Sequence, residues 1–151
     1  MITSRLITVD DYHMLATSLI KDEYHKTTEA DFFYEEGTAC SVFEDEKGPV
    51  LFVRGKPIVK DGTGIIQLDI QYLDNKDAKR NMRTMFEGFP ILEERAKEAG
   101  FIAFIFSSNV PLLRKFCIKR LGFEEYNEDL LVKVLQDDPK VLLDKQAEGT
   151  V

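Results

Sequence analysis

The chain has 151 residues, of which 44% are hydrophobic and 31% charged, as in one globular domain with a sizeable core. Its formal net charge of −7 at pH 7 disfavours a nucleic-acid-binding protein, because the phosphate backbone would be repelled over most of the surface. No apolar run approaches the roughly 20 residues that span a bilayer, and residues 1–9 lack the apolar core of a signal peptide. We therefore expect a cytoplasmic protein without a membrane-spanning segment.

The first part of the chain predicts a strand, a helix and an antiparallel hairpin. The predicted elements are, in order, a strand at 5–9, a helix at 11–25, a helical turn at 28–33 and two strands at 38–46 and 50–60. Apolar residues recur at helical spacing on one face of the helix, after an aspartate that can cap it. These residues are Tyr12, Leu15, Leu19 and Ile20. Proline and glycine inside the last strand limit its pairing or mark a bulge.

Residues 65–73 show the clearest strand pattern, because apolar and polar side chains alternate along them. One face carries Ile66, Leu68, Ile70 and Tyr72, and the other carries Gln67, Asp69 and Gln71. A long helix is predicted next, at 77–99, with Gly100 as its C-cap. Pro90 lies inside this helix and predicts a kink or a break near 88–89.

The last part of the chain completes an alternating pattern of strands and helices. Its predicted elements are a continuously apolar strand at 101–107, a helix that begins near Pro111 and ends at Gly122, and two short strands at 123–127 and 129–135. A strand, a crossover helix and a second buried strand make a right-handed βαβ unit after an antiparallel meander. We predict one α/β domain over 1–136, a central mixed sheet with helices on both faces, and a polar C-terminal tail at 137–151.

Metal chemistry has little support in the sequence. Cys40 and Cys117 lie far apart, and neither the cysteines nor the two histidines show the CxxC or HxxxH spacing of a zinc site. Both cysteines fall in apolar patterns and are interpreted as buried reduced thiols. His13 and His25 fall beside and at the end of the first helix and are interpreted as surface or boundary residues.

Residues 107–123, with the sequence SSNVPLLRKFCIKRLGF, carry a resemblance to a known family. They resemble the late strand, the asparagine, the following helix and the closing LGF of the GNAT superfamily of N-acetyltransferases. Asn109 matches the asparagine that commonly contacts the cofactor there, and residues 121–123 match LGF. The order of the predicted elements also resembles the family over most of the chain. The resemblance implies a GNAT-like fold, acetyl-CoA as the cofactor and an amine as the acetyl acceptor.

The cofactor loop departs from the family pattern Q/R-x-x-G-x-G/A, whose glycines let backbone N–H groups approach the pyrophosphate. Counted back from Gly100, the matching positions hold Arg80, Arg83 and Met85, and neither glycine is present. The stretch 76–83 is instead basic, and arginine binds phosphate through a bidentate fork. The candidate cofactor-binding residues are therefore Lys79, Arg80, Arg83 and Asn109. The alternative role of this basic stretch is a solvated helix face. A loop of this kind is also compatible with a phage-encoded member of the family.

The catalytic groups also depart from the family. Many members carry a tyrosine several residues before the final GF, whose hydroxyl protonates the departing thiolate of CoA, but positions 116–118 hold no hydroxyl. Cys117 is an alternative acid, although a cysteine on an apolar helix face is more often a packed residue. The polar face of 65–73 would look toward the substrate cleft in this fold, so Asp69 is the candidate general base. A hydrated strand face or an ion pair is the alternative role for this carboxylate.

These residues predict an acyl-CoA-dependent N-acetyltransferase that passes an acetyl group directly to the amine of a small molecule or a protein. The missing glycines and tyrosine favour an alternative, a catalytically inactive GNAT-like binding or assembly module. Such a module predicts a partner, for example a second copy in a homodimer. Contact with nucleic acid through 76–83 is a third alternative, which the net charge disfavours.

Overall fold

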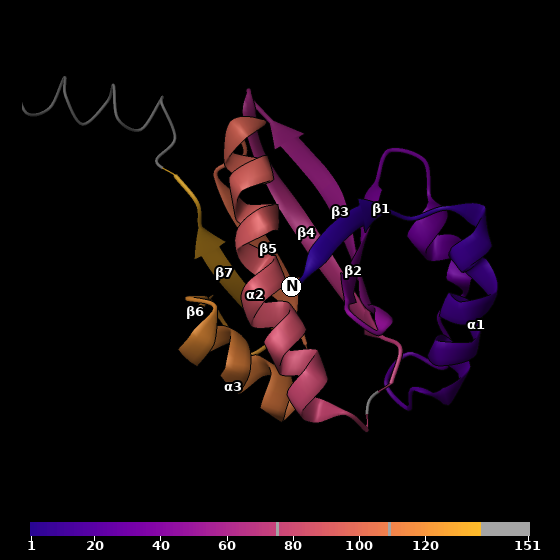
Figure 1. Ribbon diagram of the computed structural model, residues 1–151. Helices are drawn as coiled ribbons and strands as arrows, with labels where there is room; N and C mark the ends of the chain where they lie inside the picture. Colours follow the sequence, from indigo (N-terminus) through magenta and orange to yellow (C-terminus); the bar gives the residue numbers. More distant parts are fainter. Residues whose placement is uncertain (75, 109, 137–151) are drawn as a thin grey trace, which may run out of the picture.

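The computed structural model describes residues 1–74, 76–108 and 110–136, which fold into one mixed sheet with helices on both faces (Figure 1). The strands are β1 (Thr3–Leu6), β2 (Ala39–Asp45), β3 (Gly48–Lys60), β4 (Thr63–Tyr72), β5 (Ala103–Ser107), β6 (Glu124–Glu125) and β7 (Leu130–Val134). The helices are α1 (Tyr12–Lys21), α2 (Ala78–Glu98) and α3 (Pro111–Arg120), with the short 3-10 helices η1 (Val9–Asp11) and η2 (Ala30–Tyr34). The predicted tail at 137–151 lies outside the described residues.

The strands are hydrogen-bonded in the order β1-β2-β3-β4-β5-β7-β6. Every neighbouring pair is antiparallel except β4 and β5, which run parallel and are joined by the crossover helix α2. Helices α2 and α3 lie on one face of this sheet, and α1 lies beside the other face (Figure 1). The predicted fold class, an α/β mixed sheet with helices on both faces, is confirmed.

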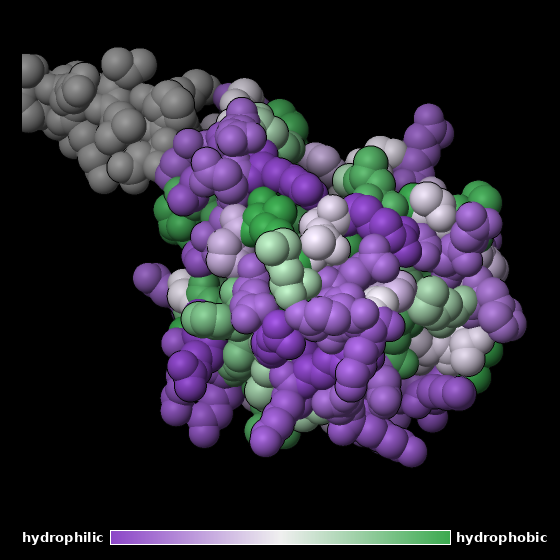
Figure 2. Space-filling model, viewed as in Figure 1, coloured by the Kyte–Doolittle hydropathy of each residue, from purple (hydrophilic) through white to green (hydrophobic). Residues whose placement is uncertain are grey.

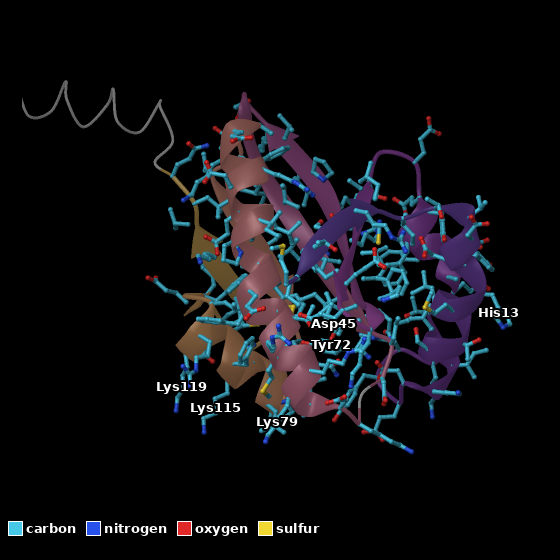
Figure 3. All side chains as sticks on the ribbon, in the orientation of Figure 1. His13, Asp45, Tyr72, Lys79, Lys115 and Lys119 are labelled. Atoms are coloured by element: carbon cyan, nitrogen blue, oxygen red, sulfur yellow. The ribbon has the colours of Figure 1, made fainter. Side chains whose placement is uncertain are left out.

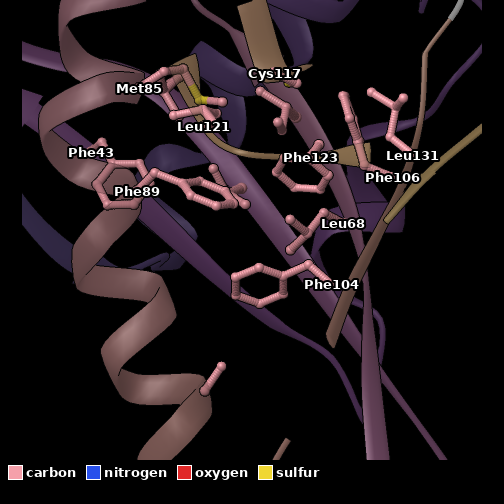
Figure 4. Packing of buried hydrophobic residues seen from close by; sticks show 14 of the residues in the cluster. Phe43, Leu68, Met85, Phe89, Phe104, Phe106, Cys117, Leu121, Phe123 and Leu131 are labelled. Carbon is pink, nitrogen blue, oxygen red and sulfur yellow. The ribbon is translucent and has the colours of Figure 1, made fainter. Parts of the chain in front are cut away.

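The main core lies between the sheet and the α2–α3 layer. Phenylalanine rings from α2, β5 and the loop between α3 and β6 meet there: Phe89 lies 5.4 Å from Phe104 and 5.6 Å from Phe123, centroid to centroid (Figure 4). Gly88 permits this packing, because a Cβ at that position would lie 3.0 Å from the ring of Phe43 on β2. The position of α2 over the sheet is therefore set by a close approach of the helix backbone to β2.

Helix α2 continues through Pro90, so the predicted break is not found. Proline removes one backbone donor, and the carbonyl of residue 86 loses its helical partner. Phe86 and Pro90 are both exposed, and water can hydrate that carbonyl. Gly100 ends the turn after the helix with a φ of 90°, as its predicted C-cap role requires.

The second face of the sheet is covered by α1 and η2. Leu15 and Leu19 of α1 are buried against Phe52 of β3, but Ile20 is 73% exposed. The prediction that Ile20 belongs to the buried stripe was therefore wrong, because the face of α1 that meets the sheet is narrower than the apolar pattern. No helix of the described residues is long and apolar enough to cross a membrane.

Pro57 explains how the long strand β3 tolerates a proline. The pairing of β2 with β3 ends at Gly55, whereas β3 continues beside β4 to Lys60. Pro57 therefore stands in a part of β3 with a partner on one side only, where a missing N–H costs no bond on the open side.

Candidate active site

Strands β4 and β5 separate part-way along their length. They pair from Ile65 with Ala103 to Leu68 with Phe106, and no pairing between them continues beyond that point. Along β4 the backbone N–H and C=O groups point alternately toward β3 and toward β5. The N–H of Leu73 donates to β3, and the carbonyl of Gly64 accepts from residue 102 beside β5. The backbone groups of even-numbered residues therefore point toward β5, and the N–H of Ile70 points into the opening.

An apolar cavity of about 420 Å³ lies on the α2–α3 side of this opening. Its walls are the end of β4, the first turns of α2 and α3, and the segment after α1. The lining residues are Lys21, Asp22, Glu23, Tyr24, His25, Ile70, Tyr72, Ala78, Asn81, Met82, Val110, Leu112, Leu113 and Phe116. The mouth of this cavity is therefore bounded by the N-terminus of α2, where backbone N–H groups attract anions.

A smaller cavity of about 140 Å³ lies next to the first and is more polar. It adds Asp69, Phe106, Ser107 and Ser108 to residues that line both cavities. The shared residues are Tyr24, His25, Ile70, Val110 and Leu113. The two cavities therefore meet at the separation of β4 and β5, with an apolar side and a polar side.

Gln71 anchors a polar network beside this junction, although its side chain is fully buried. Its amide nitrogen donates to the carbonyl of Tyr72 at 2.9 Å and to the carboxylate of Asp22 at 3.2 Å. Its amide oxygen lies 2.6 Å from Nδ1 of His25, and Asp22 lies 3.3 Å from the same nitrogen. Asp22 is 5% exposed, so a buried carboxylate supports an imidazole that faces both cavities.

Asp69 lines the polar cavity, at the position where the sequence predicts a general base. Burial raises the pKa of its carboxyl group, and the nearby guanidinium of Arg54 opposes that rise. Arg54 donates to Asp69 at 3.1 Å and to the carbonyl of Phe32 at 2.9 Å, and it stacks on the Phe32 ring at 3.8 Å. Asp69 is thus both a partly buried acid of the cleft and one member of an ion pair.

The candidate phosphate-binding arginines are held by carboxylates. Arg80 donates two bonds to Asp45, at 2.6 and 2.8 Å, and Arg83 lies 3.3 Å from Glu46 and 3.4 Å from Glu87. Asp45 is 5% exposed at its side chain, and Arg80 holds the pKa of that carboxyl well below its usual range. These contacts give both arginines a structural role at the start of α2.

The N-terminus of α2 also carries its own acidic cap. The carboxylate of Asp77 accepts a bond from the backbone N–H of Arg80 at 3.3 Å, as a capping residue does. One donor that a pyrophosphate would use is therefore engaged by the chain itself.

Three lysines have no partner among the described residues, and two of them, Lys79 and Lys115, adjoin lining residues of the apolar cavity. Lys79 follows the first residue of α2, and Lys115 and Lys119 stand one turn apart on α3; all three point away from the body at the same end of the molecule (Figure 3). Lys115 is next to the lining residue Phe116. Of the predicted cofactor-binding residues, Lys79 is thus an unpaired cation, whereas Asn109 lies outside the described residues.

The helix α3 supplies no acid, but β4 supplies a hydroxyl. Cys117 is 1% exposed and packs in the main core, and burial raises the pKa of its thiol to about 12. Tyr72 lines the apolar cavity, no described residue forms a hydrogen bond with its hydroxyl, and burial raises its pKa above the usual range. Tyr72 lines this cavity together with Phe116 of α3, one of the positions at which the sequence holds no hydroxyl.

Two site residues, His25 and Tyr72, escaped the prediction from sequence. The sequence pattern predicts Tyr72 on the apolar face of its strand. At the C-terminal end of β4 that face lines the apolar cavity. His25 follows the end of α1, and nothing local in the sequence pairs it with Gln71, which is 46 positions away. The sequence signal that pointed to this network was Gln71, an uncharged polar residue on the polar face of 65–73. A glutamine that is buried in a strand needs polar partners nearby.

The fold is shared with acetyltransferases of known structure. An aminoglycoside 6′-N-acetyltransferase from Enterococcus faecium matches with a TM-score of 0.67 and 12% identity, over 91% of this chain and 99% of that one. A GNAT family acetyltransferase from Brucella melitensis, in complex with acetyl-CoA, matches with a TM-score of 0.61 and 14% identity, over 91% and 90%. A GNAT family N-acetyltransferase from Escherichia coli, in complex with CoA, has a TM-score of 0.61 and 19% identity, over 91% and 83%.

No protein-family model and no curated protein matches the sequence. The structural similarity nevertheless extends over nearly the whole chain and most of each neighbour. The chain therefore has the GNAT fold.

Proposed function

We propose that this protein is an acyl-CoA-dependent N-acetyltransferase that transfers an acetyl group directly to an amine. The observation that carries this proposal is the junction of two unlike cavities where β4 and β5 separate. An apolar cavity on one side suits the extended arm of the acyl donor, and a polar cavity on the other suits an amine. A single opening through the sheet would let the two reactants meet without a covalent enzyme intermediate.

The apolar side fits acetyl-CoA, which supplies an activated thioester when bound. The unpaired edge of β4 offers the N–H of Ile70 to a carbonyl oxygen, as an exposed strand edge does for an added strand. Lys79, Lys115 and Lys119 offer positive charge to the phosphates at the mouth. We also propose Asn109 as a contact to the cofactor, because residues 107–123 resemble the corresponding segment of the family.

Arg80 and Arg83 enter this proposal as supports. Each would have to exchange a carboxylate for a phosphate in order to bind the cofactor directly. In the proposed complex Lys79 therefore makes the direct contact, while Arg80 fixes the start of α2 against the β2–β3 turn through Asp45.

Tyr72 is the proposed hydrogen-bond donor to the departing thiolate. Its raised pKa keeps the phenol protonated at neutral pH, and the apolar surroundings strengthen a bond to a charged acceptor. Tyr72→Phe keeps the ring and removes the hydroxyl. We expect kcat to fall about 10- to 100-fold, as for the loss of one hydrogen bond to a charged group, with the affinity for acetyl-CoA unchanged in a calorimetric titration. An unchanged kcat would remove Tyr72 from the reaction.

The acceptor proposed for the polar side is an amine that is cationic in solution. Asp69 lines the polar cavity, Asp22 lines the neighbouring apolar cavity, and the whole chain has a net charge of −7. Long-range attraction would raise the local concentration of a cationic substrate. Small polyamines, aminoglycosides and lysine-bearing peptides are the classes to test, and the aminoglycoside acetyltransferase among the structural neighbours adds weight to the second.

A second candidate function is a GNAT-like module without catalysis, which binds a partner or a second copy of itself. It is favoured by the acidic cap on α2 and by the two paired arginines, since both features weaken a phosphate site. Thermal unfolding with and without acetyl-CoA separates the two functions. Acetyl-CoA at a hundred times its dissociation constant would stabilise the fold by about 2.7 kcal/mol. If millimolar acetyl-CoA does not shift the unfolding temperature, the non-catalytic module is the function that remains. Size-exclusion chromatography should then reveal an assembly.

A further inference from the structure

The hydrogen bonds around Gln71 determine which nitrogen of His25 carries the proton. The amide nitrogen of Gln71 donates to the carbonyl of Tyr72 and to Asp22, so its amide oxygen is the atom that faces His25. An oxygen accepts, and Nδ1 of His25 must therefore donate across the 2.6 Å contact. In the neutral imidazole the other nitrogen, Nε2, then carries the lone pair.

This free nitrogen belongs to a ring that lines both cavities. No described residue forms a hydrogen bond with Nε2 of His25, and its side chain is 41% exposed. The buried carboxylate of Asp22 lies 3.3 Å from Nδ1, on the protein side of the ring, and helps to hold the imidazole in place. The arrangement matches that of a general base: an oriented imidazole, a carboxylate behind it and an open nitrogen in front.

Asp69 is the competing base, and its surroundings suit it less. The carboxylate is already bonded to Arg54 at 3.1 Å, and Arg54 is itself fully buried. Among the described residues its charge partners are Asp69 and the exposed Glu35. Protonation of Asp69 during a reaction would remove half of the countercharge from that buried guanidinium, which is costly. Protonation of His25 would instead create a cation beside Asp22.

We propose that His25 is the general base of the acetyl transfer, with Gln71 and Asp22 as its positioning residues, and that Asp69 attracts the acceptor. This inference rests on the proposed function. The ammonium form of the acceptor first loses one proton to water. The neutral amine nitrogen then attacks the thioester carbon and forms the C–N bond as the C–S bond breaks. The proton of the amine passes to Nε2 of His25, and the thiolate leaves beside Tyr72. His25 returns the proton to water, so no further reactant is needed.

The tautomer can be tested without any substrate, since the chain has two histidines in all. His13 is an exposed residue of α1 that points into solvent, and it serves as the internal control (Figure 3). Nitrogen-15 NMR of the histidine rings should show His25 protonated at Nδ1 in its neutral form, with His13→Gln to assign the signals. Gln71→Leu should abolish that preference. Protonation at Nε2 would overturn the inference.

Kinetics then tests the role itself, with acetyl-CoA and the amine of the panel that is acetylated fastest. His25→Gln should lower kcat about 100- to 10,000-fold, as expected for a lost general base, while the affinity for acetyl-CoA and the thermal stability change little. Free imidazole should restore part of the activity of His25→Ala, which a merely structural role would not allow. His13→Gln should behave as the wild type.

The outcomes separate this inference from the proposed function. Wild-type turnover that survives in His25→Gln but is lost in Asp69→Asn would assign the base to Asp69 and overturn the inference alone. A wild type that acetylates no amine of the panel would overturn the proposed function, and the role of His25 as a base with it, whatever tautomer the NMR spectrum shows.

Discussion

The two sides of the cleft differ in how completely the protein satisfies its own polar groups. On the donor side, carboxylates already hold Arg80 and Arg83, and Asp77 caps α2. On the acceptor side, the network of Gln71 and Asp22 ends at a nitrogen of His25 that has no described partner. Under the proposed function, this difference makes shape and apolar contact the main contributors to donor binding and places the polar chemistry on the acceptor side. Each variant below breaks or sharpens that contrast.

Blocking the junction should have the largest effect. Leu113 lines both cavities, and Leu113→Trp would fill the passage between them. We expect the stabilisation by acetyl-CoA, about 2.7 kcal/mol at a hundred times the dissociation constant, to disappear in thermal unfolding. Ile118→Trp, on α3 but in neither lining, is the matched control. If Leu113→Trp reduces the unliganded stability as well, Ala78→Trp at the exposed rim makes the same test.

Removing Arg80 should chiefly cost stability. Arg80→Ala leaves the buried carboxylate of Asp45 without its partner, and the free energy of unfolding should fall by about 1–3 kcal/mol. Arg80 depresses the pKa of Asp45, so this stabilisation is present at neutral pH and is lost as the pH falls below about 4, the usual pKa of aspartate. Urea unfolding of both proteins between pH 7 and pH 3, as an order-of-magnitude range around that pKa, should show the difference shrinking. A large loss of acetyl-CoA affinity at full stability would instead make Arg80 a phosphate ligand.

Removing the cap of α2 should have a smaller and two-sided effect. Asp77→Ala deletes the side chain that bonds the N–H of Arg80, at a cost of about 1 kcal/mol in stability. The same change frees a backbone donor and removes a negative charge, so acetyl-CoA should bind a few-fold more tightly. Calorimetric titration measures this, with the exposed Glu94→Ala near the other end of α2 as control. Weaker binding would show that the cap orders the site more than it competes with phosphate.

The fold was predictable from local patterns, and the site only in part. The alternation at 65–73, the C-cap at Gly100 and the order of strands and helices predicted the sheet and its crossover, because period and turn chemistry are local. Asp69 lines the polar cavity, and its ion pair with Arg54 is one of the alternatives that the sequence left open, so its role as a base stays a prediction.

The pairing of charges was out of reach of a sequence pattern. Arg80 and Asp45 are 35 positions apart, so the basic run at 76–83 looked free to bind phosphate. His25 shows the same limit, because the sequence marks it only as a boundary residue. Its contact with Gln71 on β4 orients the imidazole ring and leaves Nε2 without a described partner. Contacts between distant segments decide which charged residues remain available, and these contacts follow from the packing of the sheet and helices.

The central claim is that the cleft carries an acetyl group from acetyl-CoA to an amine. The direct measurement incubates the wild-type protein with acetyl-CoA and each amine of the panel, and follows the CoA thiol with a thiol reagent and the product by mass spectrometry. Cys40 and Cys117 are buried with the pKa of each thiol raised to about 12, so the protein's own thiols should stay silent. The account predicts an N-acetylated amine formed in equal amount to the released CoA; acetyl-CoA binding without any acetylated amine would contradict it.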